Sequence, residues 1–441
     1  MPVAHGEWLD LTIEKPAAGG RMIARHEGQV VLVSGAIPGE RVRARVERAD
    51  RRVAFATAVD ILEPHPDRRP AADWTCGGMT YAFIAYERQL ALKAEIIADA
   101  FARLGGLPLA RPVSVRPSPE QGYRMRARLH VADGRVGFYR ELTHDLCDPA
   151  VTGQLRPETC RVVERLSRHL RRIAREAVLA VELAENLGAT ERAVHLQLRP
   201  GAGIGWASLA TVAGLDGVTG ASYQVGPGAP AVRLGGRPWV GDPLRALLGE
   251  RLAGRARADR LDVRLERHAG AFFQANRYLL PSLVEAVVSH AGEEGRIVDL
   301  YAGVGLFAAA LAALGRDDVV AVEADRVAAA DLERNAARLG GAIEVRREPV
   351  ERYLASHAGP TPFALILDPP RTGLSRAALE GAVQHGTHRL LYVSCDAPTL
   401  ARDARRIVDA GYELAHLEAF DLFPNTPHVE LLAVFDRRNA R

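Results

Sequence analysis

The sequence predicts an α/β protein with three parts: a small β-barrel, a central α+β part and a C-terminal doubly wound domain of Rossmann type. From about residue 270, apolar strand-like runs alternate with helices of about 12 residues, the pattern of a parallel sheet. At the other end, short strands are separated by Gly and Pro turns, which is typical of a small oligonucleotide-binding barrel. A proline-rich stretch follows the barrel. We therefore divide the chain into residues 1–62, 63–266 and 267–441.

The composition is that of a globular protein. The chain has 441 residues, 48% hydrophobic and 25% charged. It has no apolar run of about 18 residues and no signal-like start, so we expect no membrane span and a cytoplasmic location. All basic residues except Lys15 and Lys93 are arginine. Codon usage explains this bias, but arginine also suits contact with phosphate, and the net charge of +3 does not decide between these explanations.

Two strand-like segments carry arginine on one face. In residues 41–46 arginine alternates with Val or Ala, so one face of the strand is apolar and the other is basic. In the central part, Arg124, Arg126 and Arg128 would share one face of a strand. For the barrel, the pattern alone leaves RNA contact and a solvated charged face equally open.

The remaining elements follow from periodicity and from breakers. The central part should contain an amphipathic helix at 90–104, strands within 112–140, a helix at 155–178 and a glycine-rich, β-rich tract at 179–266. The C-terminal part should contain helices at 280–291, at 304–314 and before 339, and strands at 296–301, 319–324, 364–368 and 390–394. Ligands of such sheets bind at the carboxyl ends of the strands.

A nucleotide-like cofactor site is predicted in the sequence IVDLYAGVGLF at residues 297–307. Gly303 and Gly305 allow close approach of the backbone to a ligand, ahead of a helix N-terminus. Glu323 ends the next strand, about 20 residues further on, where a carboxylate can accept hydrogen bonds from ribose hydroxyls. A nicotinamide cofactor is the main alternative. The third glycine of a dinucleotide motif is missing, and this absence, together with Cys395 in the same domain, favours S-adenosylmethionine.

Three residues suggest covalent catalysis on a pyrimidine. Cys395 follows the apolar run LLYVS, Asp368 precedes two prolines after another apolar run, and Glu430 lies downstream. A thiolate added to carbon 6 of uracil makes carbon 5 nucleophilic towards a methyl donor, and a base then removes the hydrogen on carbon 5. We expect Cys395 to be the nucleophile, Asp368 to bond the imide edge of the ring and Glu430 to be the base. A buried structural cysteine is the alternative for Cys395 taken alone.

The other three cysteines, at positions 76, 147 and 160, form no recognisable motif together. Four cysteines, at positions 76, 147, 160 and 395, are too few and too dispersed for a disulfide scaffold. Cys160 shares a helical spacing with Val163 and Leu166, so we interpret it as a buried core thiol. Cys147 has no visible partner. The histidines form no pair with metal-ligand spacing, and we predict no metal site.

With these motifs, the chain resembles the RNA uracil-5 methyltransferase family. The resemblance implies that Cys395 is the nucleophile and Glu430 the proton acceptor. It implies further contacts with the cofactor or the target base, by Gln274, Tyr301, Glu323 and Asp368. The matching segments are residues 271–276, 299–307, 367–373, 392–403 and 423–432.

The resemblance extends over nearly the whole chain. Residues 8–62 resemble the TRAM domain of these enzymes and the middle resembles their central RNA-binding domain, which implies RNA contact by the arginine-rich strands. Phe272, Phe273 and Phe423 are candidates to line the base pocket, with core packing as the alternative for each. The expected substrate is 23S ribosomal RNA, with transfer RNA open, and the expected state is a monomer. A cytosine-5 methyltransferase lacks support because no Pro-Cys motif is present, and a non-catalytic RNA-binding assembly factor is the alternative from another class.

One feature departs from the family pattern. Many ribosomal members hold an iron–sulfur cluster with four cysteines, three of them before and within a CGGC segment. This chain has Cys76 in a CGGM segment, with Pro70, Met79 and Thr152 at about the other ligand positions. Even if Cys147 and Cys160 were displaced ligands, only three cysteines would be available, and a cluster needs four. We therefore expect no cluster.

Overall fold

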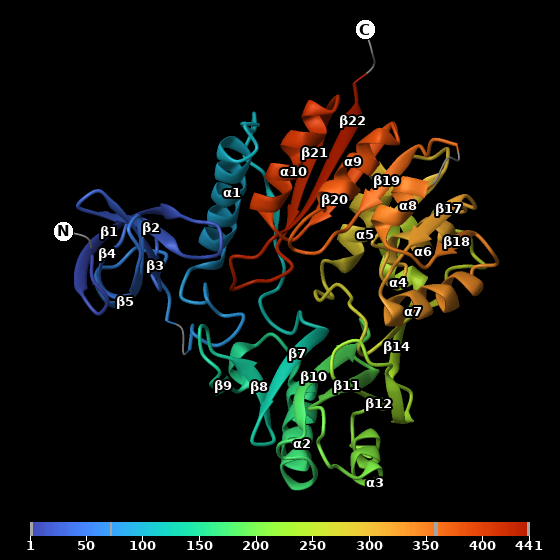
Figure 1. The fold of residues 1–441 in the computed structure, drawn as a ribbon, viewed down its shortest axis with the longest axis horizontal. Helices are drawn as coiled ribbons and strands as arrows, with labels where there is room; N and C mark the ends of the chain where they lie inside the picture. The colour runs from blue at the N-terminus through green and yellow to red at the C-terminus, as the bar shows by residue number, and fades with distance from the viewer. Residues whose placement is uncertain (1–2, 71–72, 357–359, 439–441) are drawn as a thin grey trace.

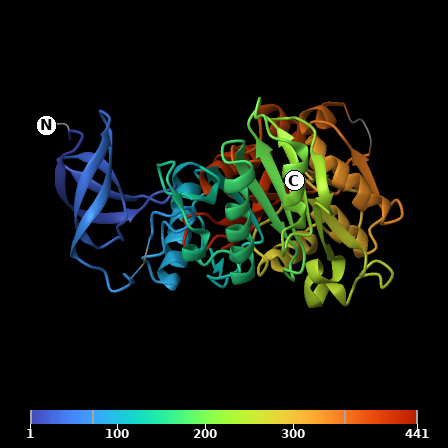
Figure 2. The ribbon, with the colours of Figure 1, turned by 90° about the horizontal axis from the view of Figure 1, so that it is seen from below.

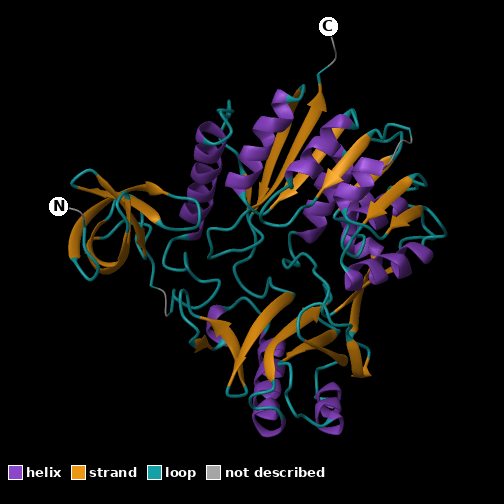
Figure 3. Ribbon diagram, in the orientation of Figure 1, coloured by secondary structure: helices purple, strands orange, loops and turns teal. Residues whose placement is uncertain are grey.

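The computed structural model describes residues 3–70, 73–356 and 360–438. Within this part of the chain, a closed barrel, a central sheet and a larger C-terminal sheet are built from successive regions. The barrel lies at one end of the molecule, beside the N-terminus, in both ribbon views (Figures 1 and 2). The central and C-terminal sheets lie opposite each other, with long loops between them (Figure 3).

The barrel confirms the prediction for the N-terminal region. Its strands are joined in the order β1-β2-β3-β5-β4. The even-numbered positions of residues 41–46 point into the barrel and are buried, while the arginines are exposed. Arg41 and Arg43 form ion pairs with Glu63 and Asp10, so part of the basic face is neutralised within the barrel. The strands are β1 (Trp8–Pro16), β2 (Met22–His26), β3 (Gln29–Ser34), β4 (Arg41–Ala49) and β5 (Val53–Glu63).

The central sheet has the strand order β13-β12-β11-β10-β7-β8-β9. Helix α2 packs its apolar side, including Val163, Leu166 and Leu170, on this sheet. Strands β14 and β15 form a separate ribbon. The strands are β7 (Arg126–Ala132), β8 (Arg135–Tyr139), β9 (Leu146–Cys147), β10 (Val178–Glu185), β11 (Arg192–Leu198), β12 (Gly220–Val225), β13 (Val232–Gly236), β14 (Trp239–Pro243) and β15 (Arg264–His268). The helices are η1 (Pro149–Thr152), α2 (Pro157–Ile173), α3 (Trp206–Ala210), η2 (Thr211–Gly214) and α4 (Leu244–Ala253).

The C-terminal sheet is doubly wound, as predicted. Its order is β18-β17-β16-β19-β20-β22-β21-β6, with β22 antiparallel between β20 and β21. Strands β16, β17 and β18 follow one another towards one edge of the sheet, and β19 and β20 towards the other. The strand order thus reverses between the parallel strands β16 and β19, and such folds bind their ligands at this switch point. The strands are β6 (Val115–Arg116), β16 (Ile297–Leu300), β17 (Val319–Val322), β18 (Ile343–Arg346), β19 (Ala364–Leu367), β20 (Arg389–Ser394), β21 (Tyr412–Phe420) and β22 (Glu430–Arg437).

Helices cover both faces of this sheet. Helices α4, α5, α6 and α7 pack on one face in one cluster of buried apolar side chains. Helices α1, α8, α9 and α10 pack on the other face in a second cluster. Because both faces are covered, the inner strands β17 and β19 are apolar and buried throughout rather than alternating. The helices are α1 (Tyr86–Arg103), α5 (Leu280–His290), α6 (Leu306–Ala313), α7 (Arg326–Ala337), α8 (Val350–Ser356), α9 (Arg376–Gln384) and α10 (Ala397–Asp409).

Besides α4, helix α1 and strand β6 of the 63–266 region also join the C-terminal sheet. Helix α1 packs against α10, and β6 pairs in parallel with β21. The described contacts thus link the region before residue 120 to the C-terminal part of the chain. The division at residues 62 and 266 stays a prediction.

Candidate active site

Four of the predicted site residues occupy equivalent places in the sheet. Tyr301, Glu323, Asp368 and Cys395 are each the first residue after a parallel strand, following β16, β17, β19 and β20. Strands β16, β17 and β19 end in register, since Leu300 pairs with both Val322 and Leu367. Strand β20 extends further, since Leu367 pairs with Tyr392, and Cys395 lies two residues beyond the position opposite Asp368. The carboxyl ends of these strands therefore bring the side chains to one edge of the sheet. They lie on both sides of the switch point between β16 and β19.

Glu430 reaches the same edge from an antiparallel strand. It is the first residue of β22, and Ser394 of β20 pairs with Leu431. Continuing this register by one residue sets Cys395 opposite Glu430. Opposite residues of an antiparallel pair lie on the same face of the sheet, so the thiol and the carboxyl group are neighbours.

The thiol of Cys395 is half-buried and free. Burial, the carboxyl group of Glu430 and, more weakly, that of Asp368 raise the pKa of Cys395 to about 11. Arg371 opposes them through its charge and through a hydrogen bond to the thiol, both of which lower this pKa. Arg371 is thus the group that favours the thiolate, and it lies three residues beyond Asp368 in the DPPR segment.

The two carboxyl groups beside the thiol are poor acids. Burial raises the pKa of Asp368 to about 7, a hydrogen bond from Gln274 lowers it and the charge of Glu323 raises it. Burial raises the pKa of Glu430 well above its ordinary value, as does Asp368, while Arg371 lowers it. Since a raised pKa makes a carboxylate a stronger base, Glu430 has the property that a general base near neutral pH needs.

The turn after β16 and the carboxylate of Glu323 form the cradle in which we predicted a ribose-bearing cofactor. The backbone N–H of Gly303 donates to Glu323 Oε2 at 2.8 Å, and that of Asp325 donates to Oε1 at 2.6 Å. Gly303 has a φ of +57° and an added Cβ would meet nothing within 4 Å, so this backbone is open. Gly305 begins α6 with a φ of +91°, and an added Cβ would lie 2.6 Å from Leu332. Each carboxylate oxygen of Glu323 keeps acceptor capacity for hydroxyl groups, so the residues fit the predicted cofactor.

Sequence reasoning missed Asp299, a carboxyl group buried beneath this cradle. Its Oδ2 accepts the backbone N–H of Ala308 at 3.1 Å, and its Oδ1 has no hydrogen-bond partner among the described residues. Burial raises its pKa to about 8, with smaller raising contributions from Asp368 and Glu323. The signal was present in the sequence, because an aspartate within the apolar strand IVDL needs an explanation.

Arg371 was also missed, although it lies only three residues after Asp368 in the sequence. Tyr301 has a positive φ of 61°, which a non-glycine residue rarely adopts. Such local strain is typical of functional turns.

The three candidate pocket aromatics differ in exposure. Phe272 is exposed, and the guanidinium of Arg126 lies 5.4 Å from the centre of its ring. Phe273 is buried under Arg267, so core packing is the correct interpretation there. Phe423 is half-buried and lies in the loop between β21 and β22, which leads to Glu430.

Of the three arginines predicted on one strand face, Arg126 and Arg128 lie on β7, whereas Arg124 precedes this strand and donates to Gln154 Oε1 at 2.6 Å. Met125, Ala127 and Leu129 are buried between the arginines. Arg126 and Arg128 both pair with Glu182 of β10, each at 3.1 Å. The carboxylate holds the two guanidinium groups side by side and offsets part of their charge.

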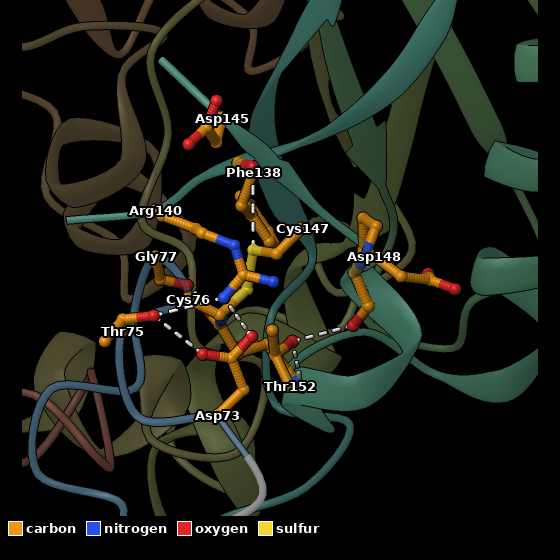
Figure 4. The surroundings of a disulfide bond; sticks show 12 residues. Asp73, Thr75, Cys76, Gly77, Phe138, Arg140, Asp145, Cys147, Asp148 and Thr152 are labelled. Atoms are coloured by element: carbon orange, nitrogen blue, oxygen red, sulfur yellow. Dashed lines mark hydrogen bonds and ion pairs between the residues drawn. A yellow bond between two sulfur atoms is a disulfide. The ribbon is translucent and has the colours of Figure 1, made fainter. Parts of the chain in front are cut away.

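The residues at the predicted cluster positions do not fit an iron–sulfur cluster. Cys76 forms a disulfide with Cys147, which corrects the expectation that Cys147 lacks a partner (Figure 4). Pro70, Met79 and Thr152 instead line a cavity of about 690 Å³. Cys160 also lines this cavity and is only half-buried, so it is not a fully buried core thiol. Two bonded cysteines and one free thiol do not supply the thiolates that a cluster needs.

The described residues include neither a metal-binding cluster nor a membrane-spanning helix. No group of three or more His, Cys, Asp or Glu side chains among them is arranged to hold a metal ion. No helix in that part of the chain has the length and apolar character that crossing a membrane requires.

Comparisons with known proteins agree with this geometry. A family model for the TRAM domain matches residues 2–59, and one for tRNA (Uracil-5-)-methyltransferase matches residues 255–438. An uncharacterised RNA methyltransferase of Streptomyces coelicolor is 32% identical over 98% of this chain and 93% of its own. The chain belongs to the RNA (uracil-5-)-methyltransferase family. The resemblance seen in the sequence is thereby confirmed.

Two other members of the family are informative. The 23S rRNA (uracil(1939)-C(5))-methyltransferase RlmD of Pseudomonas fluorescens is 33% identical over 98% of this chain and 94% of its own. The crystal structure of a Pyrococcus abyssi tRNA (uracil-54, C5)-methyltransferase, in complex with S-adenosyl-L-homocysteine, superposes with a TM-score of 0.73. It covers 97% of this chain and 100% of its own at 24% identity, and it therefore confirms the fold.

Proposed function

We propose that this protein methylates carbon 5 of a uridine in 23S ribosomal RNA, with S-adenosylmethionine as methyl donor. The observation that carries the proposal is the meeting of Cys395, Glu430, Asp368 and Arg371 at one edge of the sheet. The relatives named RlmD, such as that of Pseudomonas fluorescens, favour ribosomal RNA as the substrate. The transfer RNA enzyme shares the fold at lower identity, which does not favour transfer RNA here.

Cys395 would start the reaction by adding to carbon 6 of the uracil ring. Arg371 favours the thiolate that performs this attack, because it lowers the pKa of the thiol. Asp368 would bond the imide edge of the ring, in its protonated or ionised form according to pH. The ring then carries extra electron density at carbon 5.

The cofactor would be held by Gly303, Glu323, Tyr301 and Gln274, with Asp368 beside it. When bound, S-adenosylmethionine supplies an electrophilic methyl group on a sulfonium. Gln274 is buried and hydrogen-bonds Asp368, so it would position that carboxyl group between cofactor and base.

Glu430 would complete the cycle as the base. It removes the hydrogen on carbon 5 as a proton, the electrons form the carbon 5–carbon 6 double bond, and Cys395 leaves as a thiolate. Its place opposite Cys395 in the register sets the base beside the atom that must depart.

The RNA would lie against the central sheet and the barrel. Exposed Phe272 and partly buried Arg126 offer an aromatic ring and a cation for an unstacked base, and the barrel adds exposed arginines on β4. We further propose that the enzyme acts as a monomer in the cytoplasm, where ribosomal RNA is available.

The test is mass-spectrometric mapping of 5-methyluridine in ribosomal and transfer RNA, from cells with and without the gene. Loss at one uridine of 23S RNA, restored by the wild-type gene, is the expected result. Loss in transfer RNA alone would overturn the substrate, and no loss in either RNA would favour the non-catalytic assembly factor. The purified protein with a 23S fragment and labelled S-adenosylmethionine provides the matching assay in vitro.

A further inference from the structure

Helix α1 holds the loop that leads into Glu430. Residues 421–429 join β21 to β22 and end at this glutamate. The ammonium of Lys93, on α1, donates to Asp421 Oδ1 and, at 3.2 Å, to the carbonyl oxygen of Phe423. The side chains of Lys93 and Asp421 are both fully buried. A helix some 330 residues earlier in the chain thus fixes the start of the loop.

The second oxygen of Asp421 is held as well. The Tyr86 hydroxyl, at the first residue of α1, donates to Asp421 Oδ2 at 2.9 Å. The same hydroxyl oxygen accepts the backbone N–H of Ser118 at 2.8 Å. Both carboxylate oxygens therefore have partners, and the position of Asp421 is determined from two sides.

Gln89, also on α1, fixes the middle of the loop. Its Nε2 donates to Asn425 Oδ1 at 3.0 Å, and its Oε1 accepts the backbone N–H of Asn425 at 2.9 Å. Asn425 has a φ of +64°, a conformation that costs free energy and persists only where the surroundings impose it. The backbone N–H of Tyr81 donates to the carbonyl oxygen of Asn425 at 2.8 Å, so the loop is anchored five residues before Glu430.

The composition of the chain makes Lys93 unusual. Of 57 basic residues only two are lysines, and the other, Lys15, forms an exposed ion pair with Asp99. Lysine persists where a compact ammonium is enclosed, since the larger planar guanidinium of arginine needs a different cavity. Fold stability is a weak reason to keep a buried ion pair, because apolar residues of similar volume often serve equally well. A positional role explains the pair better.

We propose that Lys93 is a positioning residue for proton removal: through Asp421 it sets the loop that places Glu430 opposite Cys395. The inference rests on the proposed function. In the methylated adduct, Glu430 takes the hydrogen of carbon 5 as a proton, its electron pair forms the ring double bond and the carbon 6–sulfur bond breaks. A displaced Glu430 slows this step while attack and methyl transfer continue, so the methylated adduct accumulates.

The experiment compares full-length wild type with Lys93→Met, using a uridine-containing 23S fragment and methyl-labelled S-adenosylmethionine. Labelled protein–RNA adduct that survives denaturing gels is measured against labelled free RNA. We expect the ratio of adduct to product to rise about tenfold or more and kcat to fall, while kcat/KM for each substrate, which reports the steps up to methyl transfer, changes less than about twofold. Lys15→Met is the matched control and should behave as wild type.

Lys93→Met leaves the buried charge of Asp421 without its cation, which by itself can prevent folding, so two milder variants are tested as well. Tyr86→Phe removes one hydrogen bond to Asp421, and Lys93→Met/Asp421→Asn removes both charges; each should raise the ratio of adduct to product. An unchanged ratio in the variants that fold, or a parallel loss of adduct and product, overturns the inference. Absence of both species with wild type would instead overturn the proposed function.

Discussion

Cys395 and Glu430 lie opposite each other where the parallel strand β20 ends and the antiparallel strand β22 begins. The relationship places the proposed nucleophile and the proposed base 35 residues apart in sequence but adjacent in space. The two neighbouring groups also affect each other's ionisation, because both become negatively charged when they lose a proton. Glu430 raises the pKa of Cys395, and Arg371 lowers the pKa of both.

Cys395→Ala should abolish methylation while RNA binding persists. The variant lacks the atom that adds to carbon 6, so turnover should fall by at least about 10³-fold, the scale typical of a lost nucleophile. Methyl transfer to a 23S fragment and filter binding of the same RNA measure the two properties. Cys160→Ala, which removes the other free thiol, should keep both, and residual turnover in Cys395→Ala would remove the covalent mechanism.

Glu430→Gln should convert the enzyme into one that stops after methyl transfer. Without a base, the hydrogen on carbon 5 remains and Cys395 cannot leave, so a stable methylated protein–RNA adduct should form in about one equivalent per enzyme. Denaturing gels with methyl-labelled S-adenosylmethionine detect it. Glu413→Gln, an exposed carboxylate on the neighbouring strand, should turn over normally. A variant that forms neither adduct nor product would assign Glu430 to an earlier step.

The sequence predicted which side chains follow parallel strands better than it predicted how Glu430 joins them. Positions after apolar runs could be assigned to the ends of parallel strands, which correctly grouped Tyr301, Glu323, Asp368 and Cys395. The place of Glu430 depends on β22 inserting antiparallel beside β20, a long-range pairing that no local pattern specifies.

Other contacts were missed for a similar reason. Arg371 and Asp421 act through partners far away in the sequence, and the pairing of Cys76 with Cys147 spans 71 residues. Lys93 had a local signal, because it lies within the buried face of its amphipathic helix. A lysine at such a position predicts a buried acidic partner, but only the fold identifies Asp421 as that partner.

Arg371→Gln should make Cys395 less reactive at every pH below about 11. The pKa of the thiol is already raised to about 11, and loss of Arg371 removes the group that lowers it. Because the thiolate is the reactive form, alkylation by iodoacetamide should slow about tenfold for each unit of further rise. The rate is measured against pH in a Cys160→Ala background. Arg376→Gln, a highly exposed arginine nearby in sequence, is the control, and an unshifted profile would show that Arg371 does not act on the thiol.

Glu323→Gln should weaken cofactor binding more than it slows the chemical step. Its carboxylate holds the Gly303 turn and would accept the ribose hydroxyls, and hydrogen bonds to a charged group contribute about 1.5–3 kcal/mol. We expect the Kd for S-adenosylmethionine to rise about 10–100-fold, measured by calorimetry, with a much smaller change in kcat. Glu333→Gln on α7 serves as control, and an unchanged Kd would place the ribose elsewhere.

Asp299→Asn should flatten the dependence of stability on pH. The pKa of Asp299 is raised from an ordinary 3.8 to about 8, so between these values the folded protein keeps a proton that the unfolded chain has lost. Stability therefore falls as pH rises through this window, by up to about 1.4 kcal/mol per pH unit from this group. Asparagine cannot ionise, so the fall in Tm between about pH 5 and pH 8 should be smaller in the variant. Asp318→Asn, an exposed carboxylate, should leave the wild-type slope, and equal slopes in all three proteins would show that Asp299 is ionised in the fold.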